Sequence, residues 1–230
     1  RTSDGRVLFC IPWEDHVLVG TTDTPVKTAE LEPKALRSEI DFVLKTAGEY
    51  LTEKPKYSDI LSAFAGIRPL IKDGSGTKTS SLSRGHDLFV DEAGLVTITG
   101  GKWTTYRRMA EDAVNRAADV AGLEVRKSVT GDLPINCPLR ASDQSERLHP
   151  DLPYTKADIV RAVRVEMARK LEDVLARRTR ALFLNARAAI ELSQKTAEIM
   201  AGELGKDRDW IEREVKEFNE LASTYLHPLS

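Results

Sequence analysis

The sequence has few cysteines, no long apolar run and almost no net charge. Its two cysteines, Cys10 in an apolar stretch and Cys137 beside prolines, are too few for a disulfide framework or a cysteine-based metal site. No apolar run approaches the roughly 18 residues of a membrane-spanning helix, and the first residues carry no signal-peptide pattern. We therefore expect a reducing compartment, two structural thiols, no metal centre and, where the protein meets a membrane, a peripheral contact only.

The charges that are present are mixed along the chain. The formal net charge is −2 at pH 7, and the interspersed signs exclude a nucleic-acid surface and a polybasic membrane anchor, so any anion site must be local. The apolar fraction of 41% is enough for a core of ordinary size, in one large domain or two smaller ones. The chain opens on Arg1 and enters strand-like sequence almost at once, which indicates the carboxyl-terminal part of a longer polypeptide.

The first half of the chain mixes strand-like and helical stretches. Residues 6–12 and 16–22 are rich in β-branched and other apolar residues and predict a hairpin, as do residues 88–90 and 95–99 around a tight turn. Residues 33–51 place apolar side chains at helical spacing, which predicts an amphipathic helix lying on a sheet. The charged residues expected on its solvated face are Lys34, Arg37, Glu39 and Lys45. The predicted fold class is α+β.

The second half predicts an irregular linker and then helices. Residues 125–153 are rich in proline, so we place a linker there. Beyond it, apolar residues recur at helical spacing, and Thr155 with Asp158 resembles a capping box. The predicted helices cover residues 155–167, 171–184, 185–205 and 209–225. The sequence therefore predicts three parts, with an α+β part at 1–124 and a small all-helical domain at 154–230 on either side of the linker.

A strand, two glycines and a helix start follow one another at Gly100 and Gly101. Glycine lets the backbone approach a ligand without a Cβ in the way. The helix predicted to open on Lys102, followed by Trp103 and Thr104, has first N–H groups without intrahelical partners. Such a helix end attracts a ligand oxygen that carries or develops negative charge. The structural alternative is a plain strand-to-helix turn with solvated cap residues.

Two arginines and one histidine nearby are candidates for a site. Arg68 lies inside the apolar run of residues 60–71, and a buried guanidinium needs partners for its donor fork. Arg68 therefore predicts either a structural salt bridge or a ligand contact. Arg84 precedes a strand, where an arginine is usually exposed. His86 is a lone histidine, which is more often structural than a catalytic base.

Six short motifs, in the same order, resemble those of the FAD-dependent glycerol-3-phosphate dehydrogenases, respiratory flavoproteins of aerobic type. They are PWE at residues 12–14, GTTDTP at 20–25, GIRPL at 66–70, SRGH at 83–86, GGKWTTYR at 100–107 and DVLARRTR at 173–180. The eight consecutive residues of GGKWTTYR are the most specific. The resemblance implies the carboxyl-terminal part of an FAD and substrate region, with a mixed or antiparallel sheet and covering helices, followed by the helical domain, in which DVLARRTR packs.

The resemblance also implies a reaction and a role for each site residue. The reaction is oxidation of sn-glycerol 3-phosphate to dihydroxyacetone phosphate by hydride transfer to FAD, with electrons passed to a membrane quinone. Arg68 would orient the substrate, Arg84 would clamp its phosphate, and Lys102 would lie between flavin and substrate; the two arginines could exchange roles. The residues expected to contact FAD are Gly100, Gly101, Lys102, Trp103 and Thr104. The implied location is cytoplasmic, at the inner face of the cell membrane, with a homodimer as candidate assembly.

Two features depart from the family pattern. The dinucleotide fingerprint G-x-G-x-x-G is absent, so we expect this chain alone neither to retain FAD tightly nor to turn over. The family carries a considerably longer helical insertion between segments like residues 133–139 and 148–150, so either this chain is shortened there or residues near 140–148 are absent from the sequence. Two other functions stay open: a related glycerol-phosphate oxidase that uses oxygen, and a non-catalytic interaction module whose helices dock a partner.

Overall fold

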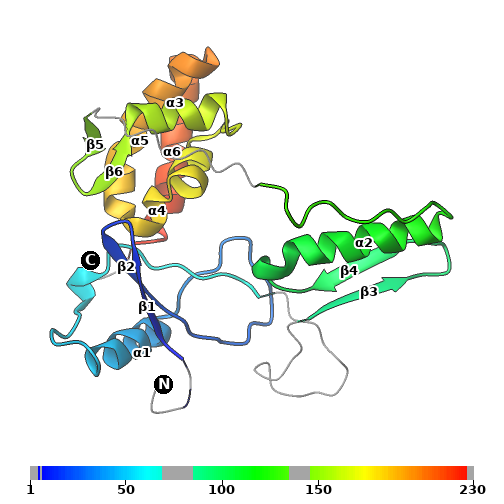
Figure 1. The fold of residues 1–230 in the computed structure, drawn as a ribbon. Helices are drawn as coiled ribbons and strands as arrows, with labels where there is room; N and C mark the ends of the chain where they lie inside the picture. The colour runs from blue at the N-terminus through cyan, green and yellow to red at the C-terminus, as the bar shows by residue number, and fades with distance from the viewer. Residues whose placement is uncertain (1–4, 6, 69–84, 135–145, 227–230) are drawn as a thin grey trace. The chain divides into compact units, whose positions relative to one another are not determined.

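The protein is an α+β structure built from small antiparallel hairpins and helices. The computed structural model describes residues 5, 7–68, 85–134 and 146–226. Within these residues the strands pair as three separate two-stranded antiparallel sheets, and helices dominate the carboxyl-terminal part (Figure 1). The predicted fold class is therefore confirmed, although the described strands form no larger sheet.

The chain divides into two compact units, which are described one at a time. The first unit combines residues 1–66 with residues 139–230, and the second contains residues 67–138. The first unit is discontinuous in sequence because an amino-terminal segment packs against the carboxyl-terminal helices. The predicted division into an α+β part, a linker and a helical domain stays a prediction.

The first unit opens with the predicted amino-terminal hairpin. Strands β1 (Phe9–Trp13) and β2 (His16–Gly20) pair with Phe9 opposite Gly20 and Trp13 opposite His16. The two turn residues, Glu14 and Asp15, both have positive φ, the backbone that matches the twist of a two-residue hairpin. Trp13 is partly buried against the hydrophobic core of this unit, which gives it a structural role.

Helix α1 (Arg37–Gly48) is shorter than the predicted 33–51. Its start is fixed by Glu39, whose carboxylate accepts the Leu36 N–H at 2.9 Å and the hydroxyls of Thr22 and Thr24 at 2.8 and 2.6 Å. The prediction that Glu39 belongs to a solvated face was therefore wrong, because this side chain ties the GTTDTP segment to the helix. Burial alone would raise the pKa of Glu39, but these hydrogen bonds outweigh it and lower that pKa.

Strands β5 (Arg147–His149) and β6 (Leu152–Thr155) form a short hairpin that the prediction of an irregular linker missed. Helix α3 (Lys156–Arg164) follows, and the Asp158 carboxylate accepts the Thr155 N–H at 2.8 Å, as the capping pattern predicts. The helix ends short of its predicted end at residue 167. Met167 has φ of 59° and is 74% exposed, so it lies outside the core.

The predicted helix 171–184 is broken. A π-helical turn η4 (Asp173–Arg178) and helix α4 (Ala181–Leu184) are separated at Arg180, which has φ of 66°. Helices α5 (Ala186–Leu204) and α6 (Arg208–Ser223) match their predictions closely. Asn185 caps α5 by accepting the Ala188 N–H, and Gly205, with φ of 64°, ends it.

The hydrophobic core lies in this carboxyl-terminal part. Apart from Ala47, every buried apolar side chain of the described residues falls between Leu152 and Ala222. The arginine-rich motif contributes residues 174–176 to this core, and its Arg177 pairs with Glu172 and Asp173. This arrangement fits the expectation of a packing role for that motif.

Residues 61–64, here called the strap, are fastened to the carboxyl-terminal helices. The Ser62 hydroxyl donates to the Leu182 carbonyl at 2.7 Å and accepts the Ala186 N–H at 2.8 Å. These are helix-terminal groups that have no partner within their own helices. The Leu61 carbonyl also accepts the Ala186 N–H at 3.1 Å, the Ala63 N–H donates to the Tyr225 carbonyl at 2.9 Å, and the Phe64 ring packs against Phe183 and Tyr225. The strap and the helices therefore form one packed body.

Candidate functional site

The second unit is built on the hairpin of β3 (His86–Val90) and β4 (Val96–Gly100). His86 lies opposite Gly100 and Val90 opposite Val96. Between the strands, Asp91 accepts the N–H groups of Ala93 and Leu95 at 2.9 Å and closes the turn. The strand, turn and strand predicted here are confirmed.

The glycine pair adopts a backbone that other residues rarely use. Gly100 and Gly101 have φ of 76° and 83°, in the left-handed region. The Gly101 N–H donates to the Gly85 carbonyl at 2.8 Å, which holds the turn to the start of β3. A Cβ on Gly101 would lie 2.2 Å from the Met109 sulfur, so the backbone requires glycine and a side chain here would also have to displace the flexible end of Met109.

The helix after the glycines begins later than predicted. Lys102 is extended and exposed, and Trp103–Thr105 forms a 3₁₀ turn, η3, before helix α2 (Tyr106–Val120). The Thr105 hydroxyl lies 3.2 Å from the Lys102 nitrogen, whose N–H it accepts. The α-helix predicted from Lys102 onward is therefore wrong for its first turn, although that turn still presents N–H groups at a helix start. The helix ends at Val120, and Gly122, with φ of 64°, lies just beyond its end.

Helix α2 lies along the hairpin (Figure 1), and its ends reach both ends of the strands. The Met109 side chain abuts Gly101, and a Cβ on Gly94 would lie 3.6 Å from the Val120 side chain. A stripe on another side of this helix is exposed and apolar or small. Its members are Trp103, Tyr106, Ala110, Val114 and Ala117. Trp103 is 86% exposed and stacks on the Tyr106 ring, so this stripe is not packed within the unit.

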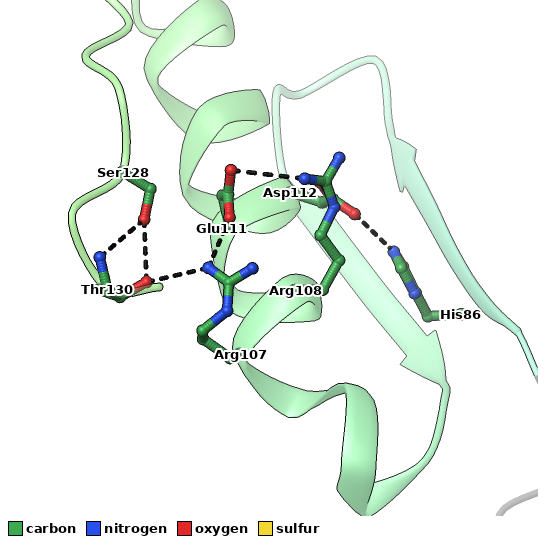
Figure 2. A network of polar contacts seen from close by, with 7 residues as sticks. All are labelled: His86, Arg107, Arg108, Glu111, Asp112, Ser128 and Thr130. Carbon is green, nitrogen blue, oxygen red and sulfur yellow. Dashed lines mark hydrogen bonds and ion pairs between the residues drawn. The ribbon is translucent and has the colours of Figure 1, made fainter. Parts of the chain in front are cut away.

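A network of polar side chains joins α2 to its surroundings (Figure 2). His86 Nε2 lies 3.0 Å from Asp112 Oδ2, and Arg108 Nε lies 3.1 Å from Asp112 Oδ1. Arg107 contacts Glu111 at 2.7 Å and the Thr130 hydroxyl at 3.1 Å. His86 is therefore held in a structural pair, as expected of a lone histidine.

The predicted site residues have different outcomes. Lys102, Gly100 and Gly101 form one turn, as the motif predicts. Arg68 is exposed, so the prediction that its apolar run would bury the guanidinium was wrong. Arg84 lies outside the described residues. The contacts of these residues with substrate or cofactor therefore stay predictions.

Several residues that link segments distant in sequence were not predicted to do so. Asp112, Ser62 and Glu39 each bond a group that lies far away in sequence. A signal was available for Asp112, since it follows Arg108 by four residues on one helix, the spacing of an ion pair. For Ser62 and Glu39, the partners could be known only from the packed structure.

Neither a metal site nor a membrane-spanning helix is found in the part of the chain that the structure describes. No group of three or more histidine, cysteine, aspartate or glutamate side chains is placed to hold a metal ion. None of the helices there has both the length and the apolar character needed to cross a membrane.

Comparisons with known proteins identify the family of the chain. A family model described as "FAD dependent oxidoreductase" matches residues 1–107, and one described as "C-terminal domain of alpha-glycerophosphate oxidase" matches residues 115–210. The chain is 35% identical to a probable mitochondrial glycerol-3-phosphate dehydrogenase of Caenorhabditis elegans and 33% identical to the mitochondrial glycerol-3-phosphate dehydrogenase of Rattus norvegicus. Each alignment covers 98% of this chain and 37% of the relative.

The chain thus spans little more than a third of the length of these relatives. Each alignment extends over 272 positions, more than the 230 residues of the chain, so the relatives carry residues that have no counterpart here. The structure also resembles that of a glycerol-3-phosphate dehydrogenase from Bacillus halodurans complexed with FAD. The TM-score is 0.73 at 23% identity, over 100% of this chain and 53% of that one, which shows a shared fold. The chain belongs to the family of FAD-dependent glycerol-3-phosphate dehydrogenases.

Proposed function

We propose that this chain is the substrate-side and carboxyl-terminal part of a flavoprotein that oxidises sn-glycerol 3-phosphate to dihydroxyacetone phosphate. The observation that carries the proposal is the turn at Gly100 and Gly101, which presents Lys102 and an open helix start. FAD would accept the hydride from C2 of the substrate and pass the electrons to a quinone. Membership in an FAD-dependent family and a relative solved with FAD support this choice of cofactor.

The residues at the turn fit a flavin that gains negative charge. With φ of 76° and 83°, the glycines bring main chain rather than side chains to the surface at this point. The N–H groups of the turn Trp103–Thr105 have the partial positive charge of a helix start. Lys102 adds a full positive charge, and the exposed Trp103 ring offers a surface for a planar ligand. Together these groups would favour a bound anionic ring system.

The two arginines and Lys102 would handle the substrate. A guanidinium donates two parallel hydrogen bonds to a phosphate or to a carbonyl that gains negative charge. Arg68 would orient the reacting end of the substrate and Arg84 would hold its phosphate, or the reverse. The exposure of Arg68 supports a role toward a ligand more than one as a buried structural ion.

This chain would need further polypeptide to complete the site. The relatives are much longer, and the fingerprint that holds a dinucleotide pyrophosphate is absent from the sequence. The exposed stripe on α2 supports the same conclusion, since Val114 on this face is 66% exposed and contiguous exposed apolar surface is a mark of an interface. We therefore infer that this chain alone neither retains FAD tightly nor turns over.

A visible absorption spectrum tests the proposal. Purified chain is mixed with FAD, desalted and treated with sn-glycerol 3-phosphate, in parallel with a polypeptide that also carries the upstream region. We expect the longer polypeptide to retain a flavin that bleaches with the substrate, and the present chain to be colourless. Lys102→Ala in the longer polypeptide should slow the bleaching, whereas Lys127→Ala, outside the site, should not. A longer polypeptide that retains flavin but does not bleach would refute the substrate assignment.

The electron acceptor and the location belong to the same proposal. One family model is described by the name of an alpha-glycerophosphate oxidase, which favours oxygen as the second candidate acceptor. Oxygen consumption with and without a quinone analogue separates the two, because a dehydrogenase consumes little oxygen and reduces the quinone. We further propose peripheral contact with the inner face of the cell membrane and a homodimer. Flotation with vesicles and light scattering of the longer polypeptide test these two points.

A further inference from the structure

We propose that His86 and Asp112, here called the latch, are positioning residues for the turn formed by Gly100, Gly101 and Lys102. The proposal rests on the function proposed above, because it assigns the latch to the geometry of the same turn. Neither residue would touch substrate or cofactor. Each would act through the backbone that presents Lys102 and the helix start.

The strand end of the latch lies directly beside the turn. His86 is the register partner of Gly100 across the β3–β4 hairpin. The residue before it, Gly85, accepts the Gly101 N–H at 2.8 Å. The side chain of His86 is 23% exposed, so its imidazole is partly shielded from water. Any shift of His86 is therefore passed to both glycines by a strand pairing and a hydrogen bond.

Asp112, the latch residue on α2, lies about one helical turn after Met109, the residue that packs against the glycine turn. Met109 abuts Gly101, and Asp112 follows Met109 by three residues, on the same side of α2. The Met109 contact is apolar and has no preferred direction. It therefore limits how closely α2 approaches the hairpin, but it does not fix the position of α2 along the strands. The His86 to Asp112 contact, at 3.0 Å, is directional and fixes the position of α2 along the strands.

Arg108 restricts the carboxylate further. Its Nε lies 3.1 Å from Asp112 Oδ1 while His86 Nε2 lies 3.0 Å from Oδ2, so both oxygens are engaged (Figure 2). A carboxylate held on both oxygens cannot rotate to follow a displaced imidazole. The latch therefore permits a narrow range of positions for the first turns of α2 against the end of β4.

The surroundings separate this role from a general contribution to stability. Partly exposed ion pairs contribute little to folding free energy, and α2 has other polar links, such as Arg107 to Glu111 and Thr130. Loss of the latch should therefore leave the fold intact. The position of a catalytic group is more sensitive, since a displacement of about 1 Å can cost about 100-fold in rate.

Kinetics of the FAD-loaded longer polypeptide test the latch. We expect His86→Ala and Asp112→Ala each to lower kcat by about 10-fold or more and to weaken FAD binding, with little change in KM for sn-glycerol 3-phosphate. The double variant should be no worse than Asp112→Ala alone, because that substitution already removes the contact with His86 as well as the contact with Arg108. His86→Gln, which can still donate to the carboxylate, should recover most of kcat. The matched control is Arg116→Ala, which breaks the Arg116 to Asp119 pair near the other end of α2 and should change nothing.

A second measurement keeps the latch testable should the reaction prove different. In the 230-residue chain, His86→Ala should speed hydrogen exchange of the Gly101 amide at least several-fold, while amides of helix α5 keep their rates. Unsubstituted enzyme that fails to oxidise sn-glycerol 3-phosphate would refute the proposed function alone. The latch is refuted by unchanged exchange at Gly101, or by additive losses of kcat in the double variant that His86→Gln does not recover.

Discussion

The carboxyl-terminal helices and the unit that carries the glycine turn differ in what they bury. The helical part encloses large side chains such as Tyr154, Leu171 and Phe218, with Phe218 only 2% exposed. In the unit of residues 67–138, none of the described residues is fully buried, even though α2 covers one face of its hairpin. A packed core stabilises the structure of the helical part, whereas the other unit exposes a surface that further polypeptide or a ligand would cover.

This difference explains why the proposed chemistry falls on the less packed unit. A helix start with an exposed apolar stripe has the composition of a binding face, with one part for an anion and another for apolar contact. The helices serve as the scaffold that holds the strap, and the strap ends two residues before the GIRPL segment begins. The comparison therefore predicts that substitutions in the helices change stability and that those in the turn change binding and turnover.

The largest expected effect is in the helical core. Phe218→Ala should lower the free energy of unfolding by about 3–5 kcal/mol, because it removes a fully buried ring and leaves a cavity. Val114→Ala, on the exposed stripe of α2, should change it by less than about 0.5 kcal/mol in this chain. Urea unfolding followed by circular dichroism measures both. If the two substitutions lowered the free energy of unfolding by similar amounts, the proposed difference between a packed core and a binding face would be refuted.

The next effect is at Gly101, where a side chain meets two obstacles. Gly101→Ala should destabilise the second unit by about 2 kcal/mol, since alanine is strained at positive φ and its Cβ would have to displace the flexible end of the Met109 side chain. Flavin reduction in the longer polypeptide should be lost. Gly122→Ala is the matched control, because it shares the positive φ but has open space around its Cβ.

Adding Met109→Ala to the Gly101→Ala variant separates the two causes. If packing matters as the geometry indicates, the smaller side chain should restore part of the lost stability, measured by thermal unfolding of the second unit. No recovery would show that backbone strain alone accounts for the loss. In that case Gly122→Ala and Gly101→Ala should also be equally destabilising.

The strap provides a smaller effect inside the helical part. Ser62→Ala should cost about 1–2 kcal/mol, because the Leu182 carbonyl loses its donor and the Ala186 N–H loses one acceptor. Limited proteolysis near residues 61–64 should become faster. Ser58→Ala, at an exposed site in η1 (Tyr57–Asp59), is the control and should leave both measurements unchanged. Unchanged stability in Ser62→Ala would mean that the aromatic contacts of Phe64 hold the strap without it.

Local patterns predicted the elements whose causes are local. Helix α5 was predicted nearly to the residue because Asn185 caps its start and Gly205 ends it. The positive-φ glycines and the strand before them were likewise visible in the sequence. In each case the deciding residue has a backbone preference of its own, so no knowledge of distant contacts was needed.

Where the cause is tertiary, the sequence was not enough. The run 171–184 has good helix formers throughout, yet the chain turns at Arg180 because Thr179 bonds back to the Val174 carbonyl and Leu182 packs in the core. Arg68 was expected to be buried because its neighbours are apolar, but burial depends on what covers a segment. The latch joins residues 26 positions apart, a pairing that only strand register and helix packing define.

The smallest expected effect is the acid sensitivity of the amino-terminal segment. Hydrogen bonds from Thr24, Leu36 and Thr22 outweigh burial and lower the pKa of Glu39 below its ordinary value of 4.5. The folded state therefore releases this proton more readily than the unfolded chain. The stabilisation is fully present above pH 4.5 and is lost as the pH falls through the lowered pKa.

For this partly exposed carboxylate the contribution should stay below about 1 kcal/mol. Thr24→Val should raise the pKa of Glu39, read from the carboxyl carbon shift by NMR, and should flatten the loss of stability in acid. Thr28 lies in a nearby segment and makes no hydrogen bond to Glu39, so Thr28→Val should leave the titration of Glu39 unchanged. A Glu39 pKa that does not respond to Thr24→Val would show that the GTTDTP segment is held to α1 by its backbone, and the amino-terminal segment would then be no more sensitive to acid than the helical core.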